Sequence, residues 1–169
     1  LSAHGALYLS FLRLQKKNNF SFTYSEYLDG QTPGKTYNGV RCEDIQNLTF
    51  ADETFDLITS TGVMEHVEDD EKGFSEVFRV LRSPGYYLFT VPFSINRPTT
   101  IKRAHRDDDG NIINHHPPEY HGDPFRGEAG VFTWRNYGTD ILGLLNKIGF
   151  DASVNLVELA ELDEPMPVI

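Results

Sequence analysis

The sequence contains a single cysteine, Cys42, among its 169 residues. One cysteine excludes an internal disulfide and a zinc site built on several cysteines. The chain also lacks an apolar run near the roughly 20 residues that a membrane-spanning helix needs, and it shows no secretory signal sequence. These absences predict a cytoplasmic protein with no membrane partner.

Positive charge is also scarce. Lys and Arg number 15 against 25 Asp and Glu, which gives a formal net charge of −10. Because contacts to a nucleic-acid backbone need clustered Lys and Arg, we do not expect nucleic acid as the main partner. The composition, with 39% hydrophobic and 24% charged residues, is typical of one soluble globular domain. The chain begins with Leu1 rather than methionine, so we expect it to be part of a longer protein.

The stretch 55–93 has the pattern of a strand, a helix and a second strand. Residues 55–60 form a short β-rich run, typical of a strand buried in a parallel sheet. From residue 63 the spacing is helical, and one face would carry Val63, Val67, Phe74, Val77, Phe78 and Leu81. Ser83-Pro84-Gly85 should end this helix, and 86–91 is again β-rich. Ligands of such βαβ units bind beyond the carboxyl ends of the strands, which here are Ser60-Thr61-Gly62 and Pro92-Phe93-Ser94.

These residues, FDLITSTGVMEHVEDD…EVFRVLRSPGYYLFTVPF, resemble the central part of the class I S-adenosylmethionine (SAM)-dependent methyltransferases. The similarity is to the small-molecule, type 11 group, with EHV after the fourth strand and RVLRPGG before the fifth. It departs from that pattern at Tyr86, where a second glycine is usual. The resemblance implies an α/β fold with a Rossmann-like, mostly parallel sheet and flanking helices, from which the family's first strand is missing. It also implies SAM as the cofactor and a small-molecule methyl acceptor.

The same resemblance implies which residues hold SAM. Ser2 and Gly5 would belong to a glycine-poor version of the loop around the methionine moiety, ahead of a helix over 6–14. Glu26, near the end of a predicted strand over 20–27, would accept hydrogen bonds from ribose hydroxyls. Asp44, or Glu43 if the register slips by one, would accept the adenine amino group, while Ile45 supplies a backbone N–H and an apolar wall. Ser60 and Thr61 would meet the cofactor at the end of the fourth strand. An amphipathic surface helix over 1–14 and a solvated acid at Glu26 remain the alternatives.

Three side chains are candidates for catalytic proton transfer. Because a histidine side chain ordinarily titrates near neutrality, His66 could act as a general base, although in the resembled proteins this position more often frames the cofactor. Tyr120 and His121 lie in the run PPEYHGD, where they could orient an acceptor or take its proton. The surrounding segment 94–130 is long and rich in proline and glycine, and we expect it to cover the substrate. A rigid turn packed on the sheet is the alternative.

Histidines 105, 115, 116 and 121, with Glu119 and Asp123, also raise the question of a metal, because His and carboxylate ligands suit zinc or iron. Their spacing matches no recognised pattern, so we expect no metal.

The remaining pattern predicts a hairpin with its tip at 107–111, a helix over 141–148 that ends at Gly149, and a strand over 150–159. The sequence thus predicts one SAM-methyltransferase-like domain over 1–160 and a tail over 161–169. The expected activity is methyl transfer (EC 2.1.1.-) from SAM to an oxygen, nitrogen or carbon atom of a small molecule. A catalytically inactive methyltransferase-like binding or regulatory module and a His/carboxylate metal hydrolase remain as alternatives.

Overall fold

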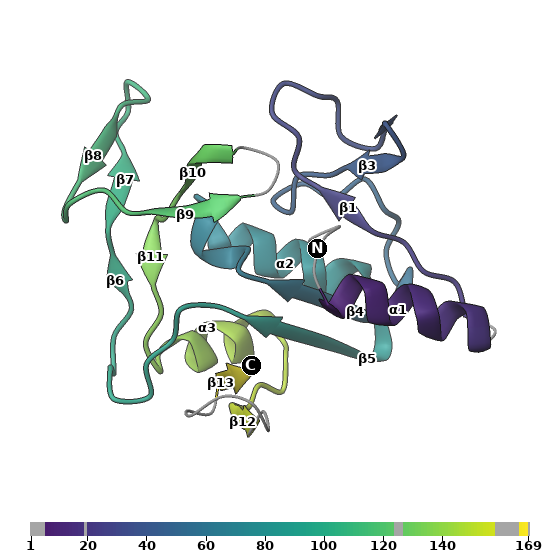
Figure 1. Ribbon diagram of the computed structural model, residues 1–169. Helices are drawn as coiled ribbons and strands as arrows, with labels where there is room; N and C mark the ends of the chain where they lie inside the picture. Colours follow the sequence, from purple (N-terminus) through teal and green to yellow (C-terminus); the bar gives the residue numbers. More distant parts are fainter. Residues whose placement is uncertain (1–5, 19, 124–126, 158–165, 169) are drawn as a thin grey trace.

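The computed structural model describes residues 6–18, 20–123, 127–157 and 166–168 (Figure 1). The helices are α1 (Ala6–Lys17), the 3₁₀ turn η1 (Met64–His66), α2 (Asp70–Val80) and α3 (Ile141–Ile148). The strands are β1 (Ser25–Glu26), β2 (Thr36–Tyr37), β3 (Val40–Cys42), β4 (Phe55–Thr61), β5 (Leu81–Thr90), β6 (Ile101–Lys102), β7 (Ala104–Arg106), β8 (Ile112–Asn114), β9 (Tyr120–Asp123), β10 (Gly127–Phe132), β11 (Arg135–Asn136), β12 (Asn155–Val157) and β13 (Met166–Val168).

The predicted βαβ unit is present. Strand β4 pairs in parallel with β5, in a register that places Leu57–Thr61 beside Tyr86–Thr90, and α2 is the connection between them. A second parallel pair is formed by β1 and β3, to which β2 adds an antiparallel edge. The α/β class with parallel strands is therefore confirmed. Within the described residues, these two groups of strands form separate hydrogen-bonded sheets.

The predicted helix over residues 63–81 is wrong at both ends. Residues 64–66 form the 3₁₀ turn, and α2 begins only after Asp69, whose carboxylate caps the helix by accepting the N–H of Lys72. At the other end the buried Leu81 leaves the helix and pairs with Phe55 as the first residue of β5. Ser83-Pro84-Gly85 therefore lies inside β5, where the register shifts before regular pairing resumes at Tyr86. Burial of Leu81 against the sheet outweighs its helical spacing in the sequence.

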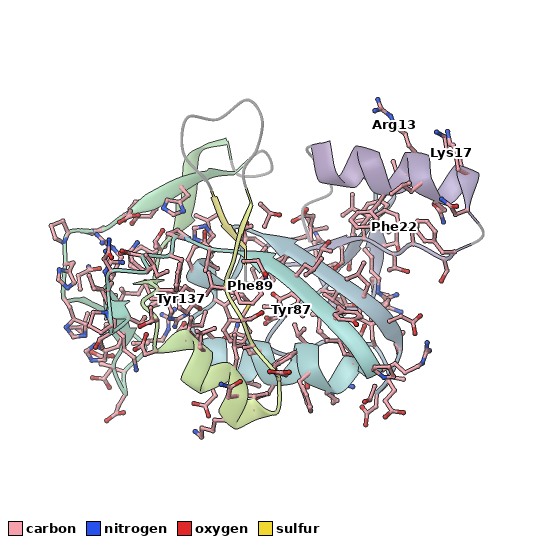
Figure 2. The ribbon with its side chains drawn as sticks, turned by 90° about the horizontal axis from the view of Figure 1, so that it is seen from below. Arg13, Lys17, Phe22, Tyr87, Phe89 and Tyr137 are labelled. Atoms are coloured by element: carbon pink, nitrogen blue, oxygen red, sulfur yellow. The ribbon has the colours of Figure 1, made fainter. Side chains whose placement is uncertain are left out.

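The core lies between the β4–β5 pair and the two helices α2 and α3. Phe74 of α2 and Ile141 of α3 belong to one buried cluster with Phe89 of β5, and Tyr137 joins it from the segment before α3 (Figure 2). Alternate residues of the strands point away from this core, and Leu57, Tyr86 and Leu88 are 43%, 70% and 48% exposed. The expectation of a buried strand is thus correct for one face of β4 only, because no described helix packs on the other face.

The segment 94–130, expected to be a long loop around one hairpin, contains several short strands. Strands β7 and β8 form the predicted hairpin, β6 pairs with β11, and β9 pairs with β10. The hairpin of β7 and β8 lies at the opposite end of the molecule from α1 (Figure 1). Many side chains of these strands are exposed, so their sequence shows little apolar alternation.

The two ends of the chain also differ from the expected lengths. The strand predicted over 20–27 is shortened to Ser25–Glu26, and Phe22 instead stacks on Phe11 of α1, with ring centroids 5.5 Å apart. The last predicted strand is shortened to β12, and β13 pairs with it in the region expected to be a tail. Among the described helices, none has the length and apolar character required to cross a bilayer.

Candidate functional site

The carboxyl end of β4 leads into a tight bend. Ser60 is buried and its hydroxyl lies 2.6 Å from the hydroxyl of Tyr87, whose pKa is raised by burial, so the phenol stays neutral. Thr61 is exposed, and Gly62 follows with a φ of 59° while its N–H donates to Thr90. A Cβ at Gly62 would lie 3.4 Å from Oε1 of Glu65. The bend therefore brings the carboxylate of Glu65 back toward the strand end.

The turn that carries Glu65 and His66 is held by a segment far along the chain. The backbone N–H of Trp134 donates to the carbonyl oxygen of Glu65 over 2.8 Å, and Nδ1 of His66 lies 2.9 Å from the carbonyl oxygen of Phe132. Only a protonated Nδ1 can donate to a carbonyl, so this contact assigns the proton of a neutral His66 to Nδ1. The Nε2 atom is then the one that can accept a proton.

Arg135 supplies the hydrogen bonds that η1 lacks at its carboxyl end. Its buried guanidinium donates to the carbonyl oxygens of Met64, Val67 and Glu68 and lies 3.3 Å from the carboxylate of Asp70. The hydroxyl of Tyr137 also donates to Asp70, over 2.9 Å, and burial raises the pKa of this phenol. These contacts explain why the chain forms a separate turn at 64–66 rather than continuing one helix.

Glu65, His66 and His121 form a compact cluster. One ligand-type atom from each lies within 4.8 Å of the others. Oε1 of Glu65 is 3.9 Å from Nε2 of His66 and 3.8 Å from Nδ1 of His121, and the two imidazole rings meet edge to face at 5.0 Å. Burial raises the pKa of Glu65, whose side chain is only 2% exposed.

His121 is oriented by a second carboxylate. Its Nε2 atom lies 2.9 Å from Oε1 of Glu119, and this hydrogen bond is the main reason that the pKa of Glu119 is lowered. The neighbouring Tyr120 is 60% exposed and packs edge-on against Phe132. The structure thus brings together two of the three predicted catalytic residues, His66 and His121. Tyr120 precedes His121 in β9, but its ring contact is with Phe132.

Sequence reasoning assigned no role to Glu65. The signal was an acid within the otherwise apolar run Gly62-Val63-Met64-Glu65, since buried acids are rare unless they are paired or functional. The four histidines that the sequence suggested as possible metal ligands do not form one cluster in the described structure. His105 and His115 stack on each other on the exposed β7–β8 hairpin, whereas His121 joins Glu65 and His66.

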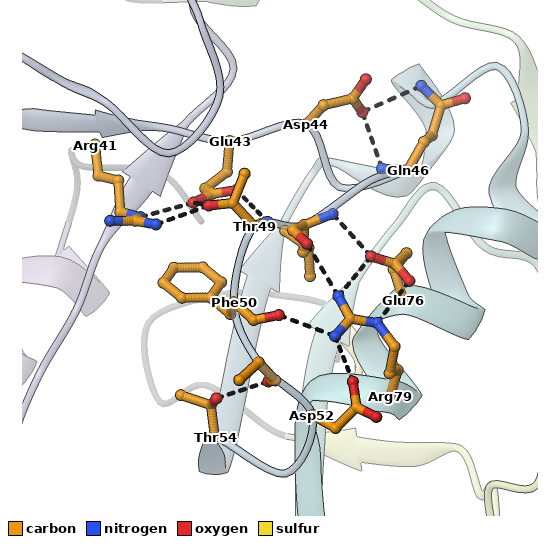
Figure 3. Close-up of polar contacts among 12 residues, drawn as sticks. Arg41, Glu43, Asp44, Gln46, Thr49, Phe50, Asp52, Thr54, Glu76 and Arg79 are labelled. Carbon is orange, nitrogen blue, oxygen red and sulfur yellow. Dashed lines mark hydrogen bonds and ion pairs between the residues drawn. The ribbon is translucent and has the colours of Figure 1, made fainter.

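Two predicted nucleoside-binding acids lie at the carboxyl ends of two neighbouring strands, β1 and β3. Glu26 ends β1 opposite Cys42, the last residue of β3, and Asp44 follows two residues later. Because β1 and β3 run in parallel, both acids are at the same edge of their sheet. The Oδ1 atom of Asp44 accepts hydrogen bonds from the backbone and side-chain nitrogens of Gln46, over 2.9 and 3.2 Å (Figure 3).

The alternative acid, Glu43, is occupied by structural contacts. It is 4% exposed, and its carboxylate accepts hydrogen bonds from Nε of Arg41, the backbone N–H of Thr49 and the hydroxyl of Thr49, at 2.6, 2.9 and 2.6 Å (Figure 3). These bonds close the loop that follows β3. They favour Asp44 over Glu43 as the residue that could face a ligand.

The loop that contains Asp44 and Ile45 is fixed to α2. Arg79 donates to the carbonyl oxygens of Leu48 and Phe50 and pairs with Glu76, which in turn accepts the N–H of Leu48 (Figure 3). Hydrogen bonding to Arg79 lowers the pKa of Glu76. Ile45 packs against both core clusters, so its position is set by the core. Ser2 and Gly5 lie outside the described residues.

Taken together, a parallel βαβ unit with polar side chains beyond its strand ends defines a Rossmann-like α/β domain, the class to which many nucleotide-binding enzymes belong. Residues 11–89 match the family model described as "Methyltransferase domain". This match covers a little under half of the chain, and within it the chain is similar to the methyltransferase domains of that family.

Two curated relatives are similar to part of this chain. Demethylmenaquinone methyltransferases of two Bacteroides fragilis strains are 46% identical over 81 residues, which is 39% of this chain and 33% of each relative. The chain therefore covers about a third of the length of these curated relatives.

Two solved structures are also similar. A SAM-dependent methyltransferase from Mesorhizobium loti is 20% identical, with a TM-score of 0.43 over 79% of this chain and 69% of that one. The 1,6-didemethyltoxoflavin-N1-methyltransferase of Burkholderia thailandensis is 18% identical, with a TM-score of 0.46 over 77% and 49%. At these values the two structures do not bear on what this chain binds or methylates.

Proposed function

We propose that this chain contributes the cofactor-facing and acceptor-facing residues of a SAM-dependent methyltransferase that acts on a small molecule. The observation that carries the proposal is the position of His66, His121 and Glu65, which meet directly beyond the carboxyl end of β4. This is the edge at which sheets of this class bind their ligands. The family match over residues 11–89 includes β1, β4 and the loop that follows β3.

The residues around the strand ends have the chemistry that SAM requires. A carboxylate at Glu26 can accept two ribose hydroxyls, and one at Asp44 can accept the amino group of adenine. The contacts of Asp44 with Gln46 and the attachment of its loop to α2 hold this acid in place before any ligand binds, which reduces the cost of ordering it. Ile45 offers an apolar surface, and Ser60 and Thr61 end the strand nearby. SAM, when bound, supplies an electrophilic methyl group on a sulfonium.

The histidine cluster would act on the acceptor side. Loss of a proton makes an oxygen, nitrogen or carbon atom a better nucleophile, and a positioned imidazole can assist this loss at neutral pH. His66 and His121 each have one ring nitrogen held by the protein and the other directed at Glu65. Tyr120 is exposed and precedes His121 in β9, and it would orient the acceptor.

Formation of S-adenosylhomocysteine, measured together with the methylated product, tests the proposal. Demethylmenaquinone is the first acceptor to try, because the Bacteroides fragilis relatives are named for it, followed by a panel of small phenols and amines. We expect SAM-dependent product with at least one acceptor. Turnover should fall roughly 100-fold or more in His121→Ala and stay unchanged in His105→Ala, which alters the exposed pair on the hairpin. Saturable SAM binding without transfer to any acceptor in the panel would favour the inactive binding module.

A further inference from the structure

We infer that Glu65, His66 and His121 form a binding site for a first-row divalent metal ion of the zinc type. Two imidazole nitrogens and one carboxylate oxygen are the donor set of many open, three-ligand metal sites. The three donor atoms lie within 4.8 Å of one another. The residues come from two distant segments, the turn after β4 and strand β9, so the cluster is made by the fold and not by local sequence.

The outer contacts of the two histidines match those of metal-bound imidazoles. Metal-ligating histidines usually donate their second ring N–H to a backbone carbonyl or a carboxylate, which fixes the ring and its tautomer. His66 does so through Nδ1 to the carbonyl oxygen of Phe132, and His121 through Nε2 to the carboxylate of Glu119, both at 2.9 Å. In the neutral rings, the lone pairs of His66 Nε2 and His121 Nδ1 are therefore on the side of Glu65.

Glu65 provides a second, independent observation. Its side chain is 2% exposed, and Oε2 is a buried oxygen with no hydrogen-bond partner in the described part of the chain. A buried carboxylate without full hydrogen bonding costs free energy. A divalent cation between the three donors would remove this cost.

The spacing allows binding with small side-chain movements. Ligands at about 2.1 Å from a tetrahedral ion lie about 3.4 Å apart, while Glu65 Oε1 is now 3.9 and 3.8 Å from the two imidazole nitrogens. The backbone around Glu65 and His66 is held by Trp134 and Arg135, so the adjustment would come mainly from His121, whose side chain is 33% exposed. This exposure also gives the ion a route from solvent.

Such an ion would leave a coordination position open, because the described residues supply three ligands. An acceptor hydroxyl or amine bound there would lose its proton more readily, since a divalent cation stabilises the anion. The ion would then replace the imidazole base of the proposed function, because it occupies the nitrogens that would otherwise take the proton. This role in methyl transfer rests on the proposed function. The binding of the metal does not, because it needs neither SAM nor an acceptor.

Titration of the tag-free, chelator-treated protein with Zn²⁺ in a calorimeter, without SAM, tests the inference. Co²⁺ serves as a spectroscopic probe, because its visible absorption reports nitrogen and oxygen ligation directly. We expect one equivalent of Zn²⁺ to bind, with affinity lowered at least 100-fold in Glu65→Gln and in His121→Ala. We expect it to fall 10- to 100-fold in Glu119→Gln, which alters the partner of His121 without removing a proposed ligand, although it also removes the ion pair of Glu119 with Arg103.

The matched control is His115→Ala, which removes a histidine from the other close pair, that of His105 and His115. It should bind Zn²⁺ like the unaltered protein. The inference would be overturned by absence of Zn²⁺ binding to the unaltered protein, by an affinity in Glu65→Gln and His121→Ala equal to that of the unaltered protein, or by loss of binding in His115→Ala alone.

Circular dichroism establishes that each variant is folded. If Glu65→Gln does not fold, the titration of His121→Ala still decides the outcome, because the His121 side chain is partly exposed and its loss disturbs the core less. Failure of this titration leaves SAM binding untouched, and failure of SAM to bind leaves the metal result standing.

Discussion

The Nδ1 atom of His66 lies 2.9 Å from the carbonyl oxygen of Phe132, although the two residues are 66 positions apart in the sequence. This contact belongs to a set through which residues 132–137 hold the turn after β4. The same segment donates to the carbonyl oxygens of Glu65 and Met64. The position of the candidate catalytic residues therefore depends on packing between the βαβ unit and the segment that precedes α3.

Arg135→Met should lower the free energy of unfolding by about 3 kcal/mol, because it removes the buried guanidinium that donates to three carbonyl oxygens and pairs with the carboxylate of Asp70. Urea unfolding followed by circular dichroism measures this. Arg82→Met is the control, since Arg82 pairs with Asp56 at the surface, where both side chains are about half or more exposed. The control should lose less than about 1 kcal/mol. Equal losses in the two variants would contradict the structural role of Arg135.

Glu76→Gln should make stability depend less on pH. Hydrogen bonds from Arg79 and Leu48 lower the folded-state pKa of Glu76 below its unfolded value of 4.5. Its contribution is therefore present above pH 4.5 and is lost as the pH falls through the folded-state pKa. We expect the variant to be less stable by about 1 kcal/mol at pH 7, with the difference closing in acid. A difference that stays constant with pH would show that Glu76 does not act through its charge.

Gly62→Ala should impair both stability and turnover. The φ of 59° at this residue costs about 1 kcal/mol for alanine, and the new Cβ would lie 3.4 Å from Oε1 of Glu65. Gly110→Ala is matched in backbone strain, with a φ of 85°, but its Cβ would meet no atom within 4 Å. Both variants should unfold at lower temperature in calorimetry. Only Gly62→Ala should also slow the formation of S-adenosylhomocysteine, and normal turnover in Gly62→Ala would contradict the placement of Glu65 at the bend.

Asp44→Ala and Glu26→Ala should each weaken SAM binding by roughly 1–3 kcal/mol, through loss of charge-assisted hydrogen bonds to the nucleoside. Asp44→Asn keeps the oxygen that Gln46 needs and separates the effect on the ligand from an effect on the loop. Asp108→Ala, an exposed acid at the tip of the β7–β8 hairpin, should bind SAM normally. Unchanged affinity in both Asp44→Ala and Glu26→Ala would refute the assignment of these acids.

How much the sequence could predict depended on whether a residue's partners are close along the chain. The parallel strands 55–61 and 86–90, the helix ending at Gly149 and the hairpin around 107–111 follow from local periodicity and turn residues. The sequence did not predict the start of α2, because Arg135, which lies far along the chain, donates to the carbonyl oxygens of Met64, Val67 and Glu68. The pairing of His66 with His121 and the burial of Glu65 were missed for the same reason.

We propose that this chain is part of a working SAM enzyme, and calorimetric titration of the purified protein with SAM is the decisive measurement. We expect saturable binding at one site per chain, competed by S-adenosylhomocysteine and retained in the presence of a chelator. The absence of saturable heat for both SAM and S-adenosylhomocysteine, in protein that unfolds cooperatively, would contradict it.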